Sequence, residues 1–413
     1  MIFLYNLVAI LASQLLKIVA LFSPKIRLFV DGRKTVFTTL SQKIKPSDKT
    51  IWLHSASLGE FEQGLPVIEK LREQFPNHKI IVTFFSPSGY EIRKHNTVAD
   101  VTVYLPLDTK SNVQKFLKLA HPEIIFFIKY EFWPNYLNEI KRQNIPTYLI
   151  SGIFRDNQVF FKWYGGFYRN ALETFSYFFV QNESSKQLLQ QIGFQNVKIS
   201  GDTRFDRVIK ILERDNSLDF IENFKAEKLT VVIGSSWPKD ESQLIDFINK
   251  NPFDVKFIIA PHNIKAEQIQ ELKNSISKKT ILFSEKENLD LSSYEVFIAD
   301  TIGILTKIYS YGDIAYVGGG FGSSGLHNIL EPATFGIPVV IGPNYQKFSE
   351  AVALVNMGGC ISVKNKKELE ETLSHLIQNE DERLEKGHIC ATFVEMNKNA
   401  TAIIMAHISN DNL

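Results

Sequence analysis

Residues 50–75 read TIWLHSASLGEFEQGLPVIEKLREQF, and this stretch contains the repeating unit from which the fold can be predicted. It begins with a short apolar run, TIWLH, and continues through a loop of small residues. The stretch that follows is amphipathic, with apolar residues spaced to share one face of a helix: Phe61, Leu65, Ile68, Leu71 and Phe75. A buried strand, a loop and a helix in this order form the first part of a βαβ unit.

The alternation of apolar runs and amphipathic stretches continues along most of the chain in two series. From about residue 50 to residue 200 the runs are TIWLH, KIIVTFF, VTVYLP, EIIFFI, TYLIS, YFFVQ and VKIS. The second series consists of LTVVIG, VKFIIA, KTILF, VFIAD, IAYVGG, PVVIG and CISV. Near-continuous apolar strands separated by helices are typical of parallel sheets covered on both faces. We therefore predict an α/β fold of two Rossmann-like, doubly wound domains that face a cleft.

The length of 413 residues also favours more than one domain. The polar stretch ERDNSLDFIENFKAEK, residues 213–228, separates the two series and is the predicted linker. The predicted domains then cover residues 31–212 and residues 229–395. In such sheets ligands bind beyond the carboxyl ends of the strands, so functional residues are expected in the loops that follow strands.

The composition argues against several classes of function. The formal net charge is +1, which gives no support for nucleic-acid binding. Cys360 and Cys390 lack metal or redox spacing and fit a reducing compartment. The sequence contains no Asp-X-Asp pair of the kind that holds a metal on a sugar nucleotide, no zinc-type His/Cys cluster and no nucleophile elbow.

The N-terminal segment, residues 1–30, begins MIFLYNLVAILASQLL and has no charged side chain before Lys17. Asn6, Ser13 and Lys17 fall on one side of a helix, and apolar residues occupy the rest. Basic residues follow it at positions 25, 27, 33 and 34. This pattern indicates a helix at a membrane interface, with basic side chains for anionic headgroups. A buried helix or a short single-span anchor is the alternative.

Three loops of the first domain carry polar residues after predicted strands. In HSASLGE, Ser57 and Glu60 have the spacing of a helix capping box, and taken alone that structural role is favoured. In FFSPSGYE, Ser88 supplies a hydroxyl near a helix start, as an ordinary cap would also do. In IKYEFWPN, Glu131 follows a strand end, where it could contact a ligand or simply be solvated.

The second domain contains a glycine-dense loop, YVGGGFGSSG, between a predicted strand and a helix. Its glycines are Gly318, Gly319, Gly320, Gly322 and Gly325. Such a loop can present backbone N–H groups to a phosphate, with a helix N-terminus behind it. Asn328 and Glu331 again have the spacing of a helix cap, and a structural role is favoured for His327.

Arg204, in the segment SGDTRFD, is the cation nearest the predicted linker. A guanidinium at the edge of a cleft suits a phosphate or a carboxylate. A surface salt bridge with Asp202 or Asp206 is the competing interpretation.

Taken together, the loops resemble those of the 3-deoxy-D-manno-octulosonic acid (Kdo) transferases of lipopolysaccharide synthesis, which have a GT-B fold. The similarity runs nearly end to end through DGRK, IWLHSASLGE, FFSPSGYE, EFWPN, QNESS, SGDTRFD, GSSWPKDE, DTIGIL, IYSYGDIAYVGGG, HNILEPATFGIPVVIGP and NYQKF. The order and spacing of these segments make the resemblance specific. It implies a C-terminal helix, residues 396–413, that crosses back to the first domain.

The resemblance also implies a reaction and its partners. Kdo would pass from CMP-Kdo, a co-substrate, to a lipid A precursor at the cytoplasmic face of the cell inner membrane, with inversion and with no metal or other cofactor. The N-terminal domain would bind the acceptor and the C-terminal domain the CMP-sugar donor. The protein would contact the membrane surface through its N-terminal helix and basic residues, and would not bind nucleic acid.

The roles carried over by the resemblance fall on named positions. Glu60 matches the general base, and a place at a helix start implies a normal or low pKa, so it is expected to be ionised at neutral pH. The expected donor-binding residues are Arg204, His262, Ile302, Gly319, Gly320, Asn328 and Glu331. The expected acceptor-binding residues are Ser57, Ser88 and Glu131.

The sequence departs from the family pattern at several of these positions. Arg204 stands where Lys is common, and His262 with Asn263 where an Arg-His pair is frequent. Lys129 replaces a common Glu, and Ile302 a common Met. Two other functions stay open: a different GT-B sugar-nucleotide enzyme, such as a non-hydrolysing 2-epimerase, and a non-catalytic, membrane-bound binder of sugar nucleotides.

Overall fold

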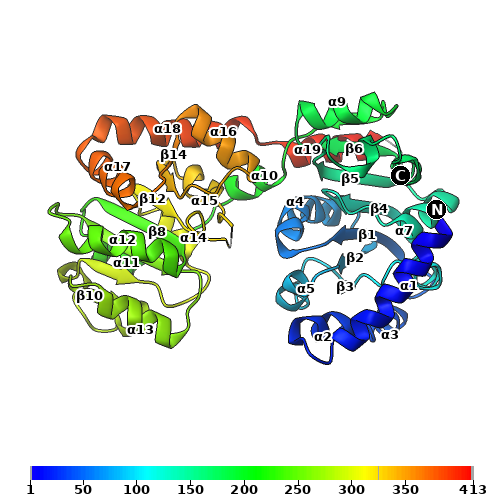
Figure 1. The fold of residues 1–413 in the computed structure, drawn as a ribbon, viewed down its shortest axis with the longest axis horizontal. Helices are drawn as coiled ribbons and strands as arrows, with labels where there is room; N and C mark the ends of the chain where they lie inside the picture. Colours follow the sequence, from blue (N-terminus) through cyan, green and yellow to red (C-terminus); the bar gives the residue numbers. More distant parts are fainter. Residues whose placement is uncertain (1, 324, 411–413) are drawn as a thin grey trace. The chain divides into compact units, whose positions relative to one another are not determined.

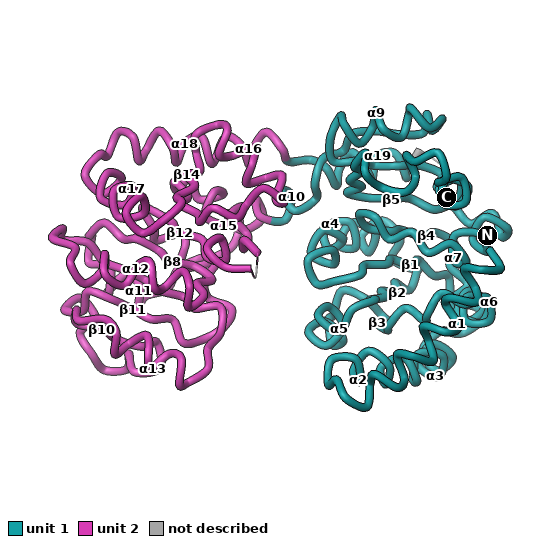
Figure 2. The backbone as a smooth tube through the Cα atoms, viewed as in Figure 1, with its two compact units in different colours: residues 1–207, 398–413 teal, residues 208–397 magenta. Residues whose placement is uncertain are grey.

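The structure, a computed structural model, describes residues 2–323 and 325–410. It divides into two compact units, coloured separately in Figure 2. Unit 1 comprises residues 1–207 and 398–413, and unit 2 comprises residues 208–397. Each unit is described by itself below.

Unit 1 contains a seven-stranded parallel sheet with the order β3-β2-β1-β4-β5-β6-β7 (Figure 1). The strands are β1 Lys49–Ser55, β2 His78–Phe84, β3 Val101–Tyr104, β4 Pro122–Ile128, β5 Thr147–Gly152, β6 Tyr177–Val180 and β7 Val197–Ile199. The strand order reverses between β1 and β4, so the loops after these two strands lie at the topological switch point of the sheet. Ligands of doubly wound sheets bind at that point.

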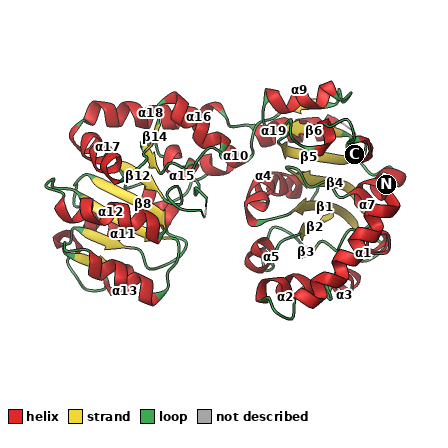
Figure 3. Ribbon diagram, in the orientation of Figure 1, coloured by secondary structure: helices red, strands yellow, loops and turns green. Residues whose placement is uncertain are grey.

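Helices cover both faces of this sheet (Figure 3). The α-helices of unit 1 are α1 Ile2–Val19, α2 Pro24–Asp31, α3 Val36–Lys43, α4 Leu58–Gln74, α5 Pro87–Arg93, α6 Lys110–Ala120, α7 Pro134–Arg142, α8 Gly166–Leu172, α9 Glu183–Gln191, α10 Arg204–Ile209, which crosses the boundary, and α19 Ala400–Asn410. A short 3₁₀ helix spans Val159–Phe161.

Successive side chains of β1 show how the core of unit 1 is built. Trp52 packs on one face among residues of α3, α6 and α7. Ile51 and Leu53 pack on the opposite face against α4 and against Ile404 of α19. All three are fully buried, because a central parallel strand alternates between two covered faces.

Unit 2 repeats this architecture with a seven-stranded parallel sheet of order β10-β11-β9-β8-β12-β13-β14. The strands are β8 Thr230–Ser236, β9 Lys256–Pro261, β10 Thr280–Leu282, β11 Val296–Ile298, β12 Ile314–Val317, β13 Val339–Ile341 and β14 Cys360–Ser362. Its α-helices are α11 Asp219–Lys225, α12 Pro238–Lys250, α13 Ala266–Ser275, α14 Leu305–Tyr309, α15 Leu330–Thr334, α16 Ser349–Met357, α17 Lys366–Gln378 and α18 Glu380–Met396. Two 3₁₀ helices span Phe283–Glu285 and Leu291–Ser293.

The predicted fold class is confirmed, since every apolar run of the two series forms one strand of a parallel sheet. The boundary lies elsewhere than expected. The structure divides the chain after Arg207, and the predicted linker, residues 213–228, contains α11. Ile221 and Phe224 of α11 are fully buried in the core of unit 2. Residues 213–228 are mostly polar because α11 exposes one side to solvent.

The N-terminal segment forms α1 and α2, which lie on unit 1. None of the side chains of α1 is buried, and α1 is the helix in the described chain that is long and apolar enough to cross a membrane. Polar contacts nevertheless hold α1 to unit 1. The Tyr5 hydroxyl donates to Asp108 at 2.6 Å, and Asn135 donates to Asn6 at 2.7 Å.

Candidate active site

Glu60 lies in the first turn of α4, directly after the switch-point strand β1. Ser57 is the N-cap residue, and the Glu60 carboxylate reaches back to accept the amide N–H of Ala56. Only 5% of Glu60 is exposed. The predicted capping box lacks its Ser57 half, because the Ser57 side chain makes no cap hydrogen bond, and the Glu60 carboxylate bonds to Ala56, one residue before the N-cap. The Glu60 carboxylate is held still, while the Ser57 hydroxyl is not used by the helix.

A second carboxylate, Glu131, approaches from the loop after β4. Lys129, which follows β4, has a φ of 63°, so the backbone turns sharply before Glu131. The indole N–H of Trp133 donates to Glu131 at 3.1 Å. This places two carboxyl groups, from the loops after β1 and β4, at the carboxyl edge of the sheet.

Burial raises the pKa of Glu60 to about 7, and the charge of Glu131 acts in the same direction. The amide of Ala56, the charge of Lys129 and the amide of Ser57 lower the pKa and offset part of this increase. The expectation of a normal or low pKa is wrong, because removal from water and a neighbouring carboxylate outweigh the helix N-terminus. Glu60 is thus poised to gain or lose a proton near neutral pH.

His54, the last apolar-run residue before the loop, is fully buried beside these carboxylates. Its Nδ1 lies 2.8 Å from the Thr83 hydroxyl, which also accepts the indole N–H of Trp52 at 2.8 Å. Its Nε2 has no hydrogen-bond partner and lies 3.6 Å from Glu131. If Thr83 donates to Nδ1, the proton of His54 is on Nε2 and faces Glu131.

The hydroxyl of Ser55, at the end of β1, is another buried polar group without a hydrogen-bond partner. Buried polar groups are usually satisfied, so each of these two unsatisfied groups at the end of β1 indicates a position where a ligand or water can complete the bonding. Ser88 follows the end of β2 closely in the sequence and is exposed. Its hydroxyl lies 2.8 Å from that of Ser86. The ring of Phe85 lies 4.6 Å from that of Trp133, which joins the loops after β2 and β4.

Arg204, at the start of α10, forms the salt bridge that the sequence left as an alternative. Its guanidinium donates to Asp202 through Nε at 2.9 Å and through Nη2 at 2.7 Å. Although burial alone would raise the pKa of Asp202, the charge and hydrogen bonds of Arg204 lower it overall. Gln63 of α4 also donates to Asp202, at 2.9 Å. Asp202 therefore holds the guanidinium of Arg204 in place.

In unit 2 the glycine-dense loop follows β12, next to β8 at the switch point of that sheet. Asp240 of α12 is fully buried and organises the loop. It accepts the Tyr316 hydroxyl at 2.8 Å, the amide of Gly319 at 2.8 Å and the amide of Trp237 at 3.0 Å. The amide of Gly319 is thus used inside the protein.

Close backbone packing explains why glycine is needed at Gly319 and Gly320. A Cβ at Gly319, whose φ is +95°, would lie 2.0 Å from the carbonyl oxygen of Gly325. A Cβ at Gly320 would lie 2.7 Å from the amide nitrogen of Gly342. The glycine density, which favoured phosphate binding in the sequence, therefore has a structural cause at these two positions.

A cavity of about 300 Å³ lies beside this loop and is lined by two of the predicted donor-binding residues, Asn328 and Glu331. It is lined by Ser235, Gly303, Leu305, Thr306, Tyr309, His327, Asn328 and Glu331. Asn328 donates to Glu331 at 3.1 Å, and the Thr306 hydroxyl donates to Glu331 at 2.7 Å. The predicted Ile302 is 80% exposed, and its neighbour Gly303 lines the cavity instead.

His262, His327 and Trp237 form a group of rings at the carboxyl end of β8 and β9. The rings of Trp237 and His262 stack 4.5 Å apart, and Trp237 donates to Nε2 of His327 at 2.9 Å. Desolvation lowers the pKa of His262, and desolvation together with His262 lowers the pKa of His327 to about 4. Both rings are neutral at pH 7, so His262 does not supply the charge of an arginine.

Thr83, Thr306 and Asp240 are among the groups at these sites that were not predicted from the sequence. Each acts through a partner from another strand or helix, and a single sequence does not show such pairing. Within the described residues, no cluster of three or more His, Cys, Asp or Glu side chains has metal-binding geometry.

Comparisons with known proteins find a matching family model and similar curated proteins. Residues 32–207 match the family model for 3-deoxy-D-manno-octulosonic-acid transferase. A curated protein of that name from Chlamydia trachomatis serovar D is 29% identical over 375 residues, which cover 87% of this chain and 86% of the relative. The one from Aquifex aeolicus is 27% identical over 343 residues, which cover 81% of this chain and 88% of the relative.

Two solved structures of other enzymes have a similar fold. A UDP-GlcNAc 2-epimerase from Neisseria meningitidis superposes with a TM-score of 0.63 and 17% identity, covering 88% of this chain and 100% of that chain. MurG from Acinetobacter baumannii superposes with a TM-score of 0.56 and 11% identity, covering 88% and 99%. At these identities the likeness concerns the fold alone, and that fold is GT-B-like. The chain is thus similar to the Kdo transferases, through the family-model match of residues 32–207 and through curated relatives that align with most of its length.

Proposed function

We propose that this glycosyltransferase moves Kdo from CMP-Kdo to a lipid A precursor, lipid IVA, in lipopolysaccharide core assembly, with Glu60 as the general base. The observation that carries the proposal is the buried Glu60 carboxyl, whose pKa is about 7, at the switch point of unit 1. A general base works best when its pKa lies near the working pH. An ordinary surface glutamate would be a weaker base.

In the proposed reaction Glu60 takes the proton of an acceptor hydroxyl as its oxygen bonds to the anomeric carbon of Kdo. The bond from that carbon to the phosphate oxygen breaks, and CMP leaves with the electron pair. Attack from the face opposite CMP inverts the anomeric configuration. We assign acceptor binding to Ser57, Ser88 and Glu131, since the Ser57 hydroxyl makes no cap bond and Ser88 is exposed.

The donor is proposed to bind unit 2 at the cavity lined by Asn328 and Glu331. A carboxylate accepts hydrogen bonds from ribose hydroxyls, and an amide can both donate and accept. Arg204, held by Asp202, is the proposed cation for the donor's negative charge, and His262 contributes as a neutral ring. Because CMP-Kdo has one phosphate, no diphosphate-chelating metal is needed, and we expect no cofactor.

Replacing Asn328 by Ala or Glu331 by Gln should weaken CMP binding about tenfold, because each change removes a polar contact worth roughly 1–3 kcal/mol. Titration calorimetry with CMP measures this directly. Glu371→Gln is the matched control, since Glu371 is an exposed residue of α17, with 64% of its side chain accessible. An unchanged CMP affinity in both variants would place the nucleotide elsewhere.

Replacing Glu131 by Gln should lower the pKa of Glu60, because the change removes a neighbouring negative charge that raises it. The acid limb of the pH–rate profile should then move to lower pH, so the variant keeps more of its maximal rate at pH 6 than the wild type. Glu73→Gln, an exposed change on the same helix, should leave the limb in place. A limb unmoved by Glu131→Gln would show that the titrating base is not Glu60.

We place the enzyme at the cytoplasmic face of the inner membrane. Contact of α1 with this membrane would bring the enzyme to its lipid acceptor. Along α1 most of the apolar side chains are exposed to solvent, including Phe3 at 79% and Leu4 at 63%. An apolar helix surface of this extent is typical of membrane contact.

One experiment separates this proposal from its rivals. The full chain is incubated in detergent with CMP-Kdo and a tetraacylated lipid A precursor, and the molecular mass of the lipid is measured by mass spectrometry. We expect the lipid to gain the mass of Kdo. Epimerisation of UDP-GlcNAc in a parallel sample would favour the 2-epimerase function, and binding of CMP-Kdo without any product across a range of detergents would favour a non-catalytic binder.

A further inference from the structure

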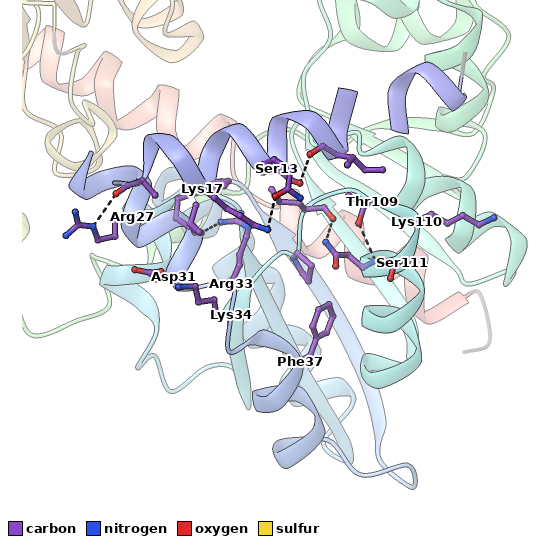
Figure 4. Close-up of a pocket in the computed structure, with 18 of the residues that line it drawn as sticks. Ser13, Lys17, Arg27, Asp31, Arg33, Lys34, Phe37, Thr109, Lys110 and Ser111 are labelled. Atoms are coloured by element: carbon purple, nitrogen blue, oxygen red, sulfur yellow. Dashed lines mark hydrogen bonds and ion pairs between the residues drawn. The ribbon is translucent and has the colours of Figure 1, made fainter. Parts of the chain in front are cut away.

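A cavity of about 1070 Å³ lies beneath α1 in unit 1, apart from the residues assigned to the reaction (Figure 4). One wall is α1, a second is the segment from Arg27 to Phe37, and a third is the start of α6 from Thr109. The polar residues of α1, among them Ser13 and Lys17, line this cavity. The apolar side chains of α1 largely lie outside it.

The lining of this cavity combines positive charge with apolar surface. Its charged residues are Lys17, Arg27, Asp31, Arg33, Lys34 and Lys110. The single carboxylate, Asp31, pairs with Lys34 at 2.6 Å. Within the described chain, Lys17 and Arg33 form no ion pair, and Lys17 donates only to Gln14, at 3.1 Å. The cavity is therefore strongly positive.

Arg33 gives the clearest sign of a missing anion. Its guanidinium donates to the carbonyl oxygens of Phe29 at 2.8 Å, Phe85 at 2.8 Å and Leu105 at 2.9 Å, and lies 3.6 Å over the Phe29 ring. Burial penalises its charged form and lowers its pKa, and no carboxylate offsets this. A charge taken out of water is normally balanced by an opposite charge.

We propose that this cavity binds the phosphate-bearing headgroup of an anionic phospholipid of the bilayer. Inorganic phosphate would leave most of a 1070 Å³ cavity empty, and it would not use the apolar walls formed by Ile10, Leu21 and Phe37. A phospholipid supplies both an anion and apolar chains, and the cytoplasmic leaflet is rich in anionic lipids.

The tethering of α1 determines how the helix would meet such a bilayer. Its N-terminal end is held by the Tyr5–Asp108 bond. Just beyond its C-terminal end, Arg27 donates to the carbonyl oxygens of Ala20 and Leu21 at 3.2 and 3.1 Å. A helix held to the protein at both ends lies in the interface, with its apolar face in the acyl region and the cavity at headgroup depth. The bound lipid would hold α1 in that plane.

The test uses the full-length protein and short-chain lipids kept below micelle formation. Binding of phosphatidylglycerol, phosphatidylcholine and inorganic phosphate is compared by the shift in thermal unfolding. Saturable stabilisation by phosphatidylglycerol is expected, with little from the other two. Equal stabilisation by phosphatidylcholine, or by inorganic phosphate alone, would overturn the proposal.

Two variants locate the binding. Lys17→Gln removes a cavity charge and should weaken phosphatidylglycerol binding about fivefold, the equivalent of the roughly 1 kcal/mol of one basic residue at an anionic surface. Ser13→Phe fills the cavity without changing charge and should abolish saturable binding. The matched controls are Lys25→Gln and Ala12→Phe, which lie on α2 and α1 but do not line the cavity.

Retention of wild-type affinity by both Lys17→Gln and Ser13→Phe, with circular dichroism confirming the fold, would overturn the proposal. The proposal would also be overturned if a lipid A precursor bound to the cavity and no phospholipid did. The cavity would then bind the acceptor. Transfer to an acceptor dispersed in detergent should be unchanged in Lys17→Gln. This result separates failure of the lipid site from failure of the proposed reaction.

Discussion

Replacing Glu60 by Gln should lower the rate of Kdo transfer by about 10²- to 10⁴-fold, the usual contribution of a general base. Glutamine keeps an oxygen that can accept the Ala56 amide, so the start of α4 is preserved. It cannot accept a proton from the acceptor hydroxyl. Because CMP binding is assigned to unit 2, titration calorimetry should give the same CMP affinity for the variant and the wild type.

The same substitution should change stability in a way that depends on pH. The pKa of Glu60 is raised from 4.5 to about 7 in the folded protein. Between these values the folded state holds a proton that the unfolded state releases, so stability falls as pH rises through this window. A glutamine at this position cannot titrate, and the Glu60→Gln variant should gain roughly 2–3 kcal/mol over the wild type at pH 8, with little gain at pH 5.

Urea unfolding of both proteins at the two pH values measures this gain. Glu73→Gln, on the exposed side of α4, controls for the loss of a glutamate and should show no pH-dependent gain. Near-normal transfer by Glu60→Gln would mean that the base lies elsewhere. A gain in stability that is equal at pH 5 and pH 8 would mean that the Glu60 pKa is not raised.

Replacing Asp240 by Ala should destabilise unit 2 by about 3–5 kcal/mol. Asp240 is fully buried and accepts hydrogen bonds from the Tyr316 hydroxyl and the Gly319 amide. Its removal leaves a buried hydroxyl and buried amides without acceptors, and each unsatisfied group costs about 1–3 kcal/mol. The glycine-dense loop loses its anchor, so CMP affinity should fall as well.

Thermal and urea unfolding, together with CMP titration, measure these effects. Asp240→Asn retains one acceptor oxygen and should lose less stability than Asp240→Ala. Asp254→Ala is the control for a surface aspartate, since 80% of the Asp254 side chain is exposed, and it should cost under about 1 kcal/mol. A loss as small in Asp240→Ala as in Asp254→Ala would contradict the role assigned to Asp240.

The sheets could be predicted from the sequence because each buried parallel strand is a short, continuous run of apolar residues. Ile51, Trp52 and Leu53 are all apolar since both faces of β1 are covered, and such runs are visible without knowing their partners. The boundary after Arg207 was harder to place. The stretch that forms α11 is polar on its outside, and its buried residues, Ile221 and Phe224, were too few to outweigh that composition.

Candidate site residues could be proposed from the sequence where their own loop marks them. Glu60 was found by its position after a strand and by the resemblance, but its pKa was not. That value depends first on burial and then on the charge of Glu131, which lies in the loop after another strand of the sheet. The glycines were recognised, yet the partners that explain Gly319 and Gly320, namely Gly325 and Gly342, become neighbours only in the folded chain.

The charge environments of Arg204 and His262 could not be predicted from the sequence for the same reason. Arg204 looked like a cation at a cleft edge, and only the fold shows that Asp202 takes two of its donors. His262 looked like a replacement for an arginine, and only the fold shows its ring stacked on Trp237, where desolvation keeps it neutral. Sequence identifies the candidate groups, and packing sets their charge.

The pH dependence of kcat/KM for Kdo transfer, which reports the pKa values of the free enzyme, tests most directly whether Glu60 acts as a buried base. The rate should rise in proportion to the ionised fraction of Glu60, with an acid limb centred at a pKa of about 7, and should level off above it. A rate that is already maximal near pH 5 would contradict this account, because the base would then have the pKa of an ordinary, solvated glutamate.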